Sequence, residues 1–217
     1  MIWLFDLDNT LVDREGAFLA WASAEVAARG LSPADLAAIV EADEGGFARK
    51  EDTAAVVVER LGWDLSVADT VEAFRAGIRE HVTAYPGVVE ALEALRARGE
   101  RIAVVTNGAG HQQRGKLAVT GLAERFEAVV VSGEAGVKKP DPRIIDLALE
   151  ALGVPGAARD DVWMIGDALH ADVAAGQAAG VRTAWIAHGR PWAGEGQRPD
   201  VVADTTIEVI EEISGRG

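Results

Sequence analysis

The chain has 217 residues, enough for one large domain or for a core with a small inserted domain. Its formal net charge is −14, from 21 Lys and Arg against 35 Asp and Glu. With no basic cluster to grip a phosphate backbone, we expect no nucleic-acid polymer as a partner. Cysteine is absent, which excludes disulfides, thiolate catalysis and cysteine-bound zinc. No apolar run is long enough for a signal peptide or a membrane span, so we expect a cytoplasmic protein without a membrane partner.

The first expected element is a buried strand that ends in two acids. Residues 1–5 form an apolar run of bulky side chains, typical of a strand buried in a sheet. Asp6 and Asp8 follow, one residue apart, and therefore lie on the same side of an extended chain. Asp13 is expected to cap the helix or turn that comes next.

The stretch from about Arg14 to Tyr85 contains helical patterns and no convincing strand. We expect a small helical bundle, inserted after the first strand and packed over one end of the sheet. Trp21 is either a core residue or a ring that stacks on a base, and Arg49 with Lys50 is either a surface pair or a grip for a substrate anion. The expected helices cover residues 16–29, 33–41, 52–61 and 66–81.

Helices with clear boundaries separate the elements of the second part of the chain. Pro86 and Gly87 open one helix, which ends at Gly99. Asp141 is expected to be the N-cap of another, with proline at its first position and Gly153 at its end. The apolar stripe of this second helix is expected to contain Ile144, Leu147, Ala148 and Ala151.

Short β-rich runs alternate with these helices from Arg101 onward. This order predicts an α/β fold, a Rossmann-like doubly wound parallel sheet with helices on both faces. A loop rich in Gly and Pro over 189–197 precedes a short edge strand and a last helix. The expected strands cover residues 102–105, 128–131, 162–165, 183–186 and 201–203.

Polar residues recur where the core strands end. Thr106 and Asn107 follow one strand, Lys139 lies in the loop after the next, and Asp167 follows a third. Because ligands bind at the carboxyl edge of a parallel sheet, we expect these residues to converge with the acids of the first strand. Carboxylates gathered in one place repel each other unless a cation lies among them. Mg²⁺ fits such a site, because it is a hard ion that binds few carboxylates and completes its coordination shell with water and phosphate oxygens.

A metal ion and Lys139 would lower the negative potential at this edge. One carboxylate could then approach an anionic phosphoryl group as a nucleophile. Asp8, two residues beyond Asp6, is placed to protonate a leaving alcohol and then to activate water. These residue types in this order therefore indicate phosphoryl transfer through an aspartyl-phosphate.

Four segments resemble, in order, the four motifs of the haloacid dehalogenase-like hydrolase superfamily. The resemblance covers nearly the whole chain and implies a phosphatase-type core over 1–13 and 86–217, with an all-helical cap domain over 14–85. Two further segments, 106–108 and 184–189, are similar to pyrimidine 5′-nucleotidase-type members. The four motif segments are Asp6-Leu7-Asp8-Asn9-Thr10, Val104-Val105-Thr106-Asn107, Gly136-Val137-Lys138-Lys139-Pro140-Asp141 and Gly166-Asp167 with Asp172.

The resemblance implies a role for each catalytic residue. Asp6 would be the nucleophile and Asp8 the general acid/base. Thr106 would hydrogen-bond the phosphoryl oxygens, and Lys139 would neutralise the charge of the nucleophile and the phosphoryl group. The adjacent Lys138 is expected to be a surface charge.

It also implies the ligands of the metal and contacts to substrate. The Mg²⁺ ligands would be the Asp6 side chain, the Asp8 carbonyl and Asp167. Asp172 would be a further ligand, a partner of the lysine, or a helix cap. Asn107 is expected near the substrate, and Asn9 either there or holding the turn.

The expected function is therefore a Mg²⁺-dependent phosphatase acting on a small phosphorylated metabolite, such as a nucleotide, a sugar phosphate or a phosphoglycolate-like acid. Alternatives on the same residues are a phosphomutase, a haloacid dehalogenase and a phospho-aspartate signalling receiver. His111 with Arg114, and likewise the segment His188-Gly189-Arg190, either reach the substrate or lie in solvent. A monomer or a homodimer is expected.

Overall fold

The computed structural model describes residues 1–192 and 198–216, so residues 193–197 of the expected loop lie outside the described part. Two compact units make up the chain. The first joins Met1–Val12 to Ala84–Gly217, and the second is Asp13–Thr83.

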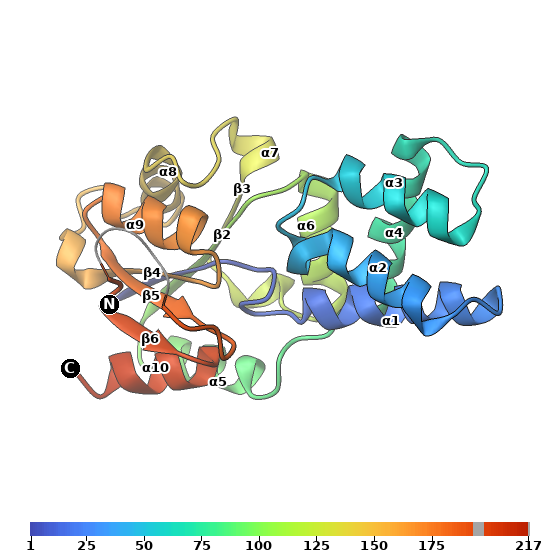
Figure 1. Ribbon diagram of the computed structural model, residues 1–217. Coiled ribbons are helices and arrows are strands. Elements are labelled where there is room, and N and C mark those ends of the chain that lie inside the picture. Colours follow the sequence, from blue (N-terminus) through green and yellow to red (C-terminus); the bar gives the residue numbers. More distant parts are fainter. Residues whose placement is uncertain (193–197, 217) are drawn as a thin grey trace. The chain divides into compact units, whose positions relative to one another are not determined.

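A six-stranded parallel sheet is the centre of the first unit, as the sequence predicts (Figure 1). Its order is β3-β2-β1-β4-β5-β6, so the first strand of the chain lies in the middle of the sheet. Phe5 at the end of β1 is opposite Val104 on one side and Ile165 on the other. This register brings the residues that follow β1, β2 and β4 to one edge. The strands are β1 (Ile2–Phe5), β2 (Arg101–Thr106), β3 (Ala128–Val131), β4 (Val162–Gly166), β5 (Arg182–Ile186) and β6 (Val201–Ala203).

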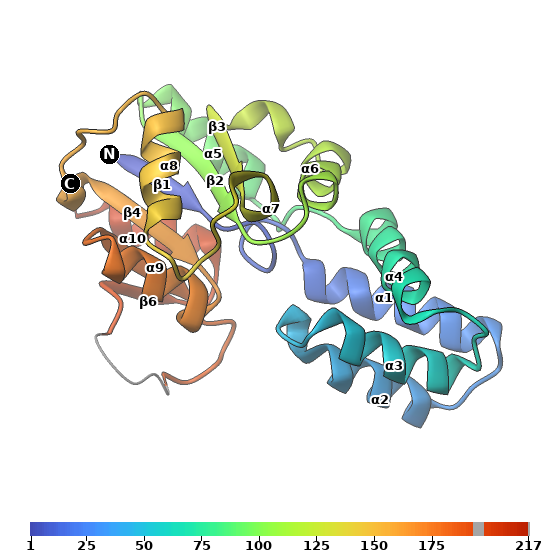
Figure 2. The same ribbon diagram turned by 90° about the horizontal axis from the view of Figure 1, so that it is seen from above.

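Helices cover both faces of this sheet (Figures 1 and 2). On one face lie α8 (Arg143–Ala151) and α9 (Ala174–Ala178), and on the other α5 (Val88–Ala97) and α10 (Thr206–Ser214). Two helices, α6 (Gly110–Val119) and α7 (Ser132–Ala135), follow β2 and β3. The remaining turns of this unit are η2 (Ala123–Arg125), η3 (Arg159–Asp161) and the π-helical η4 (Leu169–Val173).

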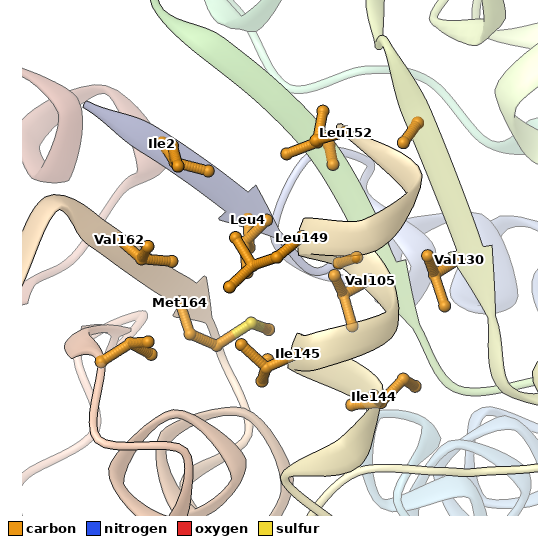
Figure 3. Close-up of a cluster of buried hydrophobic side chains, with 14 residues drawn as sticks. Ile2, Leu4, Val105, Val130, Ile144, Ile145, Leu149, Leu152, Val162 and Met164 are labelled. Atoms are coloured by element: carbon orange, nitrogen blue, oxygen red, sulfur yellow. The ribbon is translucent and has the colours of Figure 1, made fainter. Parts of the chain in front are cut away.

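A cluster of buried hydrophobic side chains lies between α8 and the sheet (Figure 3). The helix presents a stripe that differs in part from the predicted one, because Leu147 is only partly buried and Ala151 is exposed. Pro142 is the N-cap of α8, not Asp141, although the Asp141 carboxylate does accept a hydrogen bond from the backbone N of Arg143 (3.0 Å). The residues of α8 and its C-cap that are buried in this cluster are Ile144, Ile145, Ala148, Leu149 and Leu152.

The second unit is a bundle of consecutive helices, again as predicted. Asp13 caps the first helix by accepting from the backbone N of Gly16 (2.8 Å), and Ser32 forms a capping box with Asp35 at the start of the second. The helices are α1 (Arg14–Ala28), α2 (Pro33–Asp43), α3 (Lys50–Leu61) and α4 (Val67–His81), with the short turn η1 (Glu44–Gly46) after α2.

Aromatic rings fill the core of this bundle. Trp21 is 5% exposed and packs against Phe18, Trp63 and Phe74 at centroid distances of 5.4, 6.2 and 6.0 Å. A side chain at Gly77 would overlap the indole, its Cβ falling 2.0 Å from Trp21 Cδ1, so glycine there allows the close approach. Trp21 is therefore a core residue.

Arg14 and Asp43 form a buried ion pair within the same bundle. Arg14 Nη2 donates to Asp43 Oδ1 at 2.7 Å, and the guanidinium carbon lies 5.0 Å from the centre of the Phe18 ring. Both side chains are at most 5% exposed. No helix among the described residues has the length and hydrophobicity needed to cross a membrane.

Candidate active site

Asp6 begins the site, directly after the central strand. Its backbone N donates to the carbonyl of Ile165 (2.8 Å), which continues the pairing of β1 with β4 for one more residue. The side chain is buried and points to Lys139, whose Nζ donates to Asp6 Oδ1 at 2.5 Å. The predicted nucleophile and the predicted lysine are thus in direct contact.

The ammonium group of Lys139 contacts three different parts of the fold. Besides Asp6, it donates to the carbonyl of Val105 (2.6 Å) and lies 2.7 Å from Asp172 Oδ1. Only 3% of the residue is exposed. Burial alone would lower the pKa of this ammonium, but the carboxylates of Asp172 and Asp6 outweigh it and raise the pKa. The lysine therefore carries a permanent charge at this edge of the sheet.

Three buried carboxylates surround this charge. Oxygens of Asp6, Asp167 and Asp172 lie within 4.8 Å of one another. Burial, with the neighbouring carboxylates adding to it, raises the pKa of Asp6 to about 7 and that of Asp167 to about 8. A cation among them would favour the ionised forms. Hard oxygen donors without sulfur or imidazole fit Mg²⁺ or a similar hard ion, so this triad could hold a metal.

Asp172 reaches the triad from η4, the π-helical turn after β4. Its Oδ2 accepts from the backbone N of Ala168 (2.9 Å), so the side chain also holds the loop that carries Asp167. A Cβ added to Gly166 would fall 2.1 Å from Asp172 Oδ2. Glycine at this position therefore makes room for the carboxylate.

Asp8 lies outside the carboxylate triad and has partners that the sequence analysis did not identify. Lys116 Nζ is 2.7 Å from both carboxylate oxygens of Asp8, and Gln113 Nε2 donates to Asp8 Oδ2 at 3.1 Å. Both partners come from α6 and are buried. Because α6 has no clear apolar stripe, the sequence pattern does not indicate that these two residues point inward.

Thr106 and Asn107, at the end of β2, connect to the other site residues in different ways. The Thr106 hydroxyl accepts from Gln113 Nε2 (2.7 Å). The Asn107 amide forms a reciprocal pair with the backbone of Lys139, donating to its carbonyl (3.0 Å) and accepting from its N (2.9 Å). The Asn107 side chain therefore fixes the loop that delivers the lysine, and contact with a substrate stays a prediction.

Asn9 is a buried turn residue with φ of 54°. Its carbonyl accepts a hydrogen bond from His188 Nε2 (2.6 Å), and His188 lies against Tyr85 with ring centres 5.8 Å apart. From the sequence His188 either contacts the substrate or lies in solvent, and in the structure its imidazole is hydrogen-bonded to the loop after β1. A substrate contact of Asn9 stays a prediction.

Arg190, which the sequence leaves open between substrate and solvent, is a second neighbour of the site. Its Nη2 donates to the carbonyls of Asp167 (2.8 Å) and Ile186 (3.1 Å) and lies 3.5 Å from Asp167 Oδ2. The guanidinium carbon is 5.6 Å from the centre of the Trp185 ring. Burial and the carboxylates of Asp6 and Asp172 raise the pKa of Asp167 by more than the charge of Arg190 lowers it.

The other charged candidates have local partners. Arg114 pairs with Glu134 (Nη2 to Oε2, 2.7 Å) at the surface, which favours the solvent interpretation for this residue. Arg49 is exposed, and Lys50 donates to the carbonyl of Gly46 (2.8 Å) within the second unit. Both interpretations of Arg49 and Lys50, a surface pair and a grip for a substrate anion, stay predictions.

Comparison with known proteins gives consistent matches. Residues 3–186 match the family described as haloacid dehalogenase-like hydrolase. The pyrimidine 5′-nucleotidase YjjG of Escherichia coli is 38% identical over 144 residues, which are 65% of this chain and 60% of the relative. The N-acetylmuramic acid 6-phosphate phosphatase of Pseudomonas aeruginosa is 32% identical over 193 residues, 86% of this chain and 81% of the relative. The matched segment thus spans less than two thirds of the nucleotidase.

The fold has a match among solved structures. The hydrolase YfnB from Bacillus subtilis, bound to magnesium, has a TM-score of 0.77 with 22% sequence identity, and the match covers 98% of each chain. At this identity the likeness concerns the fold alone. It agrees with the parallel sheet and the helical insert between β1 and β2.

Proposed function

Since the chain belongs to the haloacid dehalogenase-like hydrolase family, we propose that it is a Mg²⁺-dependent phosphatase of small phosphomonoesters. The observation that carries the proposal is the buried contact of Lys139 with Asp6 and Asp172, beside the third acid Asp167. A nucleophilic carboxylate held next to a permanent positive charge is suited to attack an anionic phosphoryl group. The family members YjjG and the Pseudomonas enzyme are named for phosphate release, which supports the same reaction class.

In the first step Asp6 attacks phosphorus, and the bond from phosphorus to the leaving oxygen breaks. Asp8 gives its proton to that oxygen, so that an alcohol departs and an aspartyl-phosphate remains on Asp6. In the second step Asp8 takes a proton from water, and the water oxygen attacks phosphorus. The bond from phosphorus to the Asp6 oxygen breaks, so that phosphate leaves and the Asp6 carboxylate is restored. Lys139 and the Thr106 hydroxyl stabilise the charge on the phosphoryl oxygens during both steps.

The metal would be held by Asp6 and Asp167, with the Asp8 carbonyl as a further ligand and Asp172 either as a ligand or as support for Lys139. When bound, Mg²⁺ supplies positive charge that keeps the carboxylates ionised and offsets the charge of the phosphoryl group. Three buried carboxylates favour this chemistry over dehalogenation, which has no use for a bound metal.

We propose that the helical insert, expected over 14–85 and compact over Asp13–Thr83, is the cap domain that selects the substrate. A small phosphorylated metabolite is the proposed partner, and nucleoside monophosphates and sugar phosphates are the first classes to test. The similarity to a pyrimidine nucleotidase and to a sugar-phosphate phosphatase motivates both choices. A cytoplasmic location, as a monomer or a homodimer, accords with such a substrate.

The test measures phosphate release from pyrimidine nucleoside monophosphates, sugar phosphates and small acid phosphates, with Mg²⁺ or with chelator. Turnover should require the metal and should vanish in Asp6→Asn. Asp160→Asn is the matched control, because Asp160 is exposed and precedes β4 at the opposite end of the sheet. Acid quenching followed by peptide mass spectrometry should place a phosphoryl group on Asp6. Metal-independent release, or release that survives Asp6→Asn, contradicts the proposal.

A further inference from the structure

Lys116 is a buried lysine whose ammonium group is fully occupied by acceptors around Asp8. The residue is 7% exposed, and its Nζ lies 2.7 Å from Asp8 Oδ1, 2.7 Å from Asp8 Oδ2 and 2.9 Å from Gln113 Oε1. An ammonium has three N–H donors, and three acceptor atoms are in place. Burying a lysine carries a desolvation cost that a paired carboxylate offsets, and here that carboxylate is the proposed acid/base.

Gln113 completes the arrangement from the preceding turn of α6. It is 2% exposed, and its Nε2 donates both to Asp8 Oδ2 (3.1 Å) and to Thr106 Oγ1 (2.7 Å). Residues three apart on a helix lie on the same face, so Gln113 and Lys116 approach Asp8 together. Together the two residues leave the Asp8 carboxylate little rotational freedom.

We propose that Lys116 and Gln113 are positioning residues for Asp8, an inference that rests on the phosphatase function proposed above. As Asp8 transfers its proton to the leaving oxygen, its carboxyl group becomes a carboxylate. The ammonium of Lys116 and the amide of Gln113 already point at the oxygens that acquire this charge. They therefore stabilise the charge without reorganising at the moment of reaction.

Lys116 and Gln113 would affect the kinetics differently if they only held α6 against the loop after β1. Weakening such a structural contact lowers kcat/KM of every substrate by a similar factor. Loss of a positioned general acid instead affects substrates according to their leaving group. An alkoxide needs a proton to depart, whereas p-nitrophenolate is a stable anion and departs without one.

The experiment compares kcat/KM for an alkyl phosphomonoester and for p-nitrophenyl phosphate in Lys116→Met. We expect a loss of about 10²-fold for the alkyl substrate and of less than about threefold for the nitrophenyl substrate. Lys116→Arg keeps a cation beside Asp8 and should restore most of the alkyl activity. Arg114→Met is the matched control, since it removes an ion-paired cation from the same helix whose partner is Glu134 and not Asp8.

Equal losses on the two substrates, or a Lys116→Met that behaves like Arg114→Met, overturn this inference and leave the phosphatase function intact. Wild-type protein that releases no phosphate overturns the proposed function, and the positioning role with it. If Lys116→Met has no cooperative thermal transition, Lys116→Gln replaces it in the same comparison, because glutamine keeps a donor without the charge.

Discussion

Lys139 and Asp172 form a buried ion pair, with 2.7 Å between Nζ and Oδ1 and at most 2% of either side chain exposed. The pair joins the loop between α7 and α8 to the π-helical turn after β4. It also places a positive charge beside the proposed nucleophile.

Lys139→Met should therefore lower both stability and activity. Removing the cation leaves Asp6 and Asp172 buried without their partner, which costs about 3–5 kcal/mol in the free energy of unfolding. The turnover number should fall by at least about 10²-fold, because charge stabilisation at the phosphoryl group is lost. Urea unfolding and steady-state kinetics measure the two effects. The adjacent, exposed Lys138 gives the control, and Lys138→Met should change stability by no more than about 0.5 kcal/mol.

The stability of the metal-free protein should fall as pH rises. The pKa of Asp6, about 7, and that of Asp167, about 8, lie above the ordinary value of 3.8. Between about pH 4 and pH 8 the folded state therefore binds more protons than the unfolded state, and the free energy of unfolding decreases with pH.

Bound Mg²⁺ should reverse this trend, because the cation competes with protons for the same carboxylates. The rise in Tm on adding Mg²⁺ should be larger at about pH 8 than at about pH 6. Thermal melts with chelator and with Mg²⁺ measure the difference, and Asp167→Asn should reduce it. A Mg²⁺-induced rise that does not change with pH contradicts the assignment of the triad as the metal site.

Gly166→Ala should displace Asp172. The new Cβ would lie 2.1 Å from Oδ2, so the carboxylate has to move away from Lys139 and from Ala168. Overpacking of this kind costs about 1–3 kcal/mol, and a shift of the site by about 1 Å lowers turnover by about 10²-fold. Gly156→Ala is the control, because no atom lies within 4 Å of a Cβ there. An unchanged turnover number in Gly166→Ala would show that turnover does not depend on the position of Asp172.

The buried pair of Arg14 and Asp43 should dominate the stability of the second unit. Asp43→Ala leaves the guanidinium buried without its carboxylate, at a cost of about 3–5 kcal/mol. Glu25→Ala breaks the more exposed pair with Arg29 and should cost no more than about 1 kcal/mol. Chemical denaturation measures the free energy of unfolding of both variants. Similar losses in the two would contradict a dominant contribution of the buried pair to stability.

The sequence predicted the elements and the site residues that depend on strand ends. Asp6, Thr106 and Asp167 directly follow or end apolar runs, so the parallel order alone brought them to one edge. Asp13 was expected as a cap, and its carboxylate does cap α1. Helical periodicity also identified all four helices of the insert, including the β-branched run within α3.

The contacts that could not be predicted from the sequence depend on which face a helix turns toward the sheet edge and on the path of the loops. Lys116 and Gln113 face Asp8 only because α6 turns that side toward the loop after β1. Arg190, which the sequence leaves open between substrate and solvent, reaches the Asp167 carbonyl because the chain turns after β5, where Arg190 N donates to the carbonyl of Ala187 (2.9 Å). On α8 the apolar periodicity allowed two overlapping stripes, and contact with the sheet selected the one with Ile145 and Leu149.

The central place of β1 in the sheet affects the order in which the chain can fold during synthesis. Its neighbours begin at Arg101 and Val162, so β1 has no partner in the sheet until the whole helical insert has left the ribosome. The insert consists of consecutive helices with mostly local pairings, which form quickly, whereas the sheet must wait for pairings distant in sequence. Asp6 is thus translated before the insert, but its partner acids Asp167 and Asp172 are added only after it.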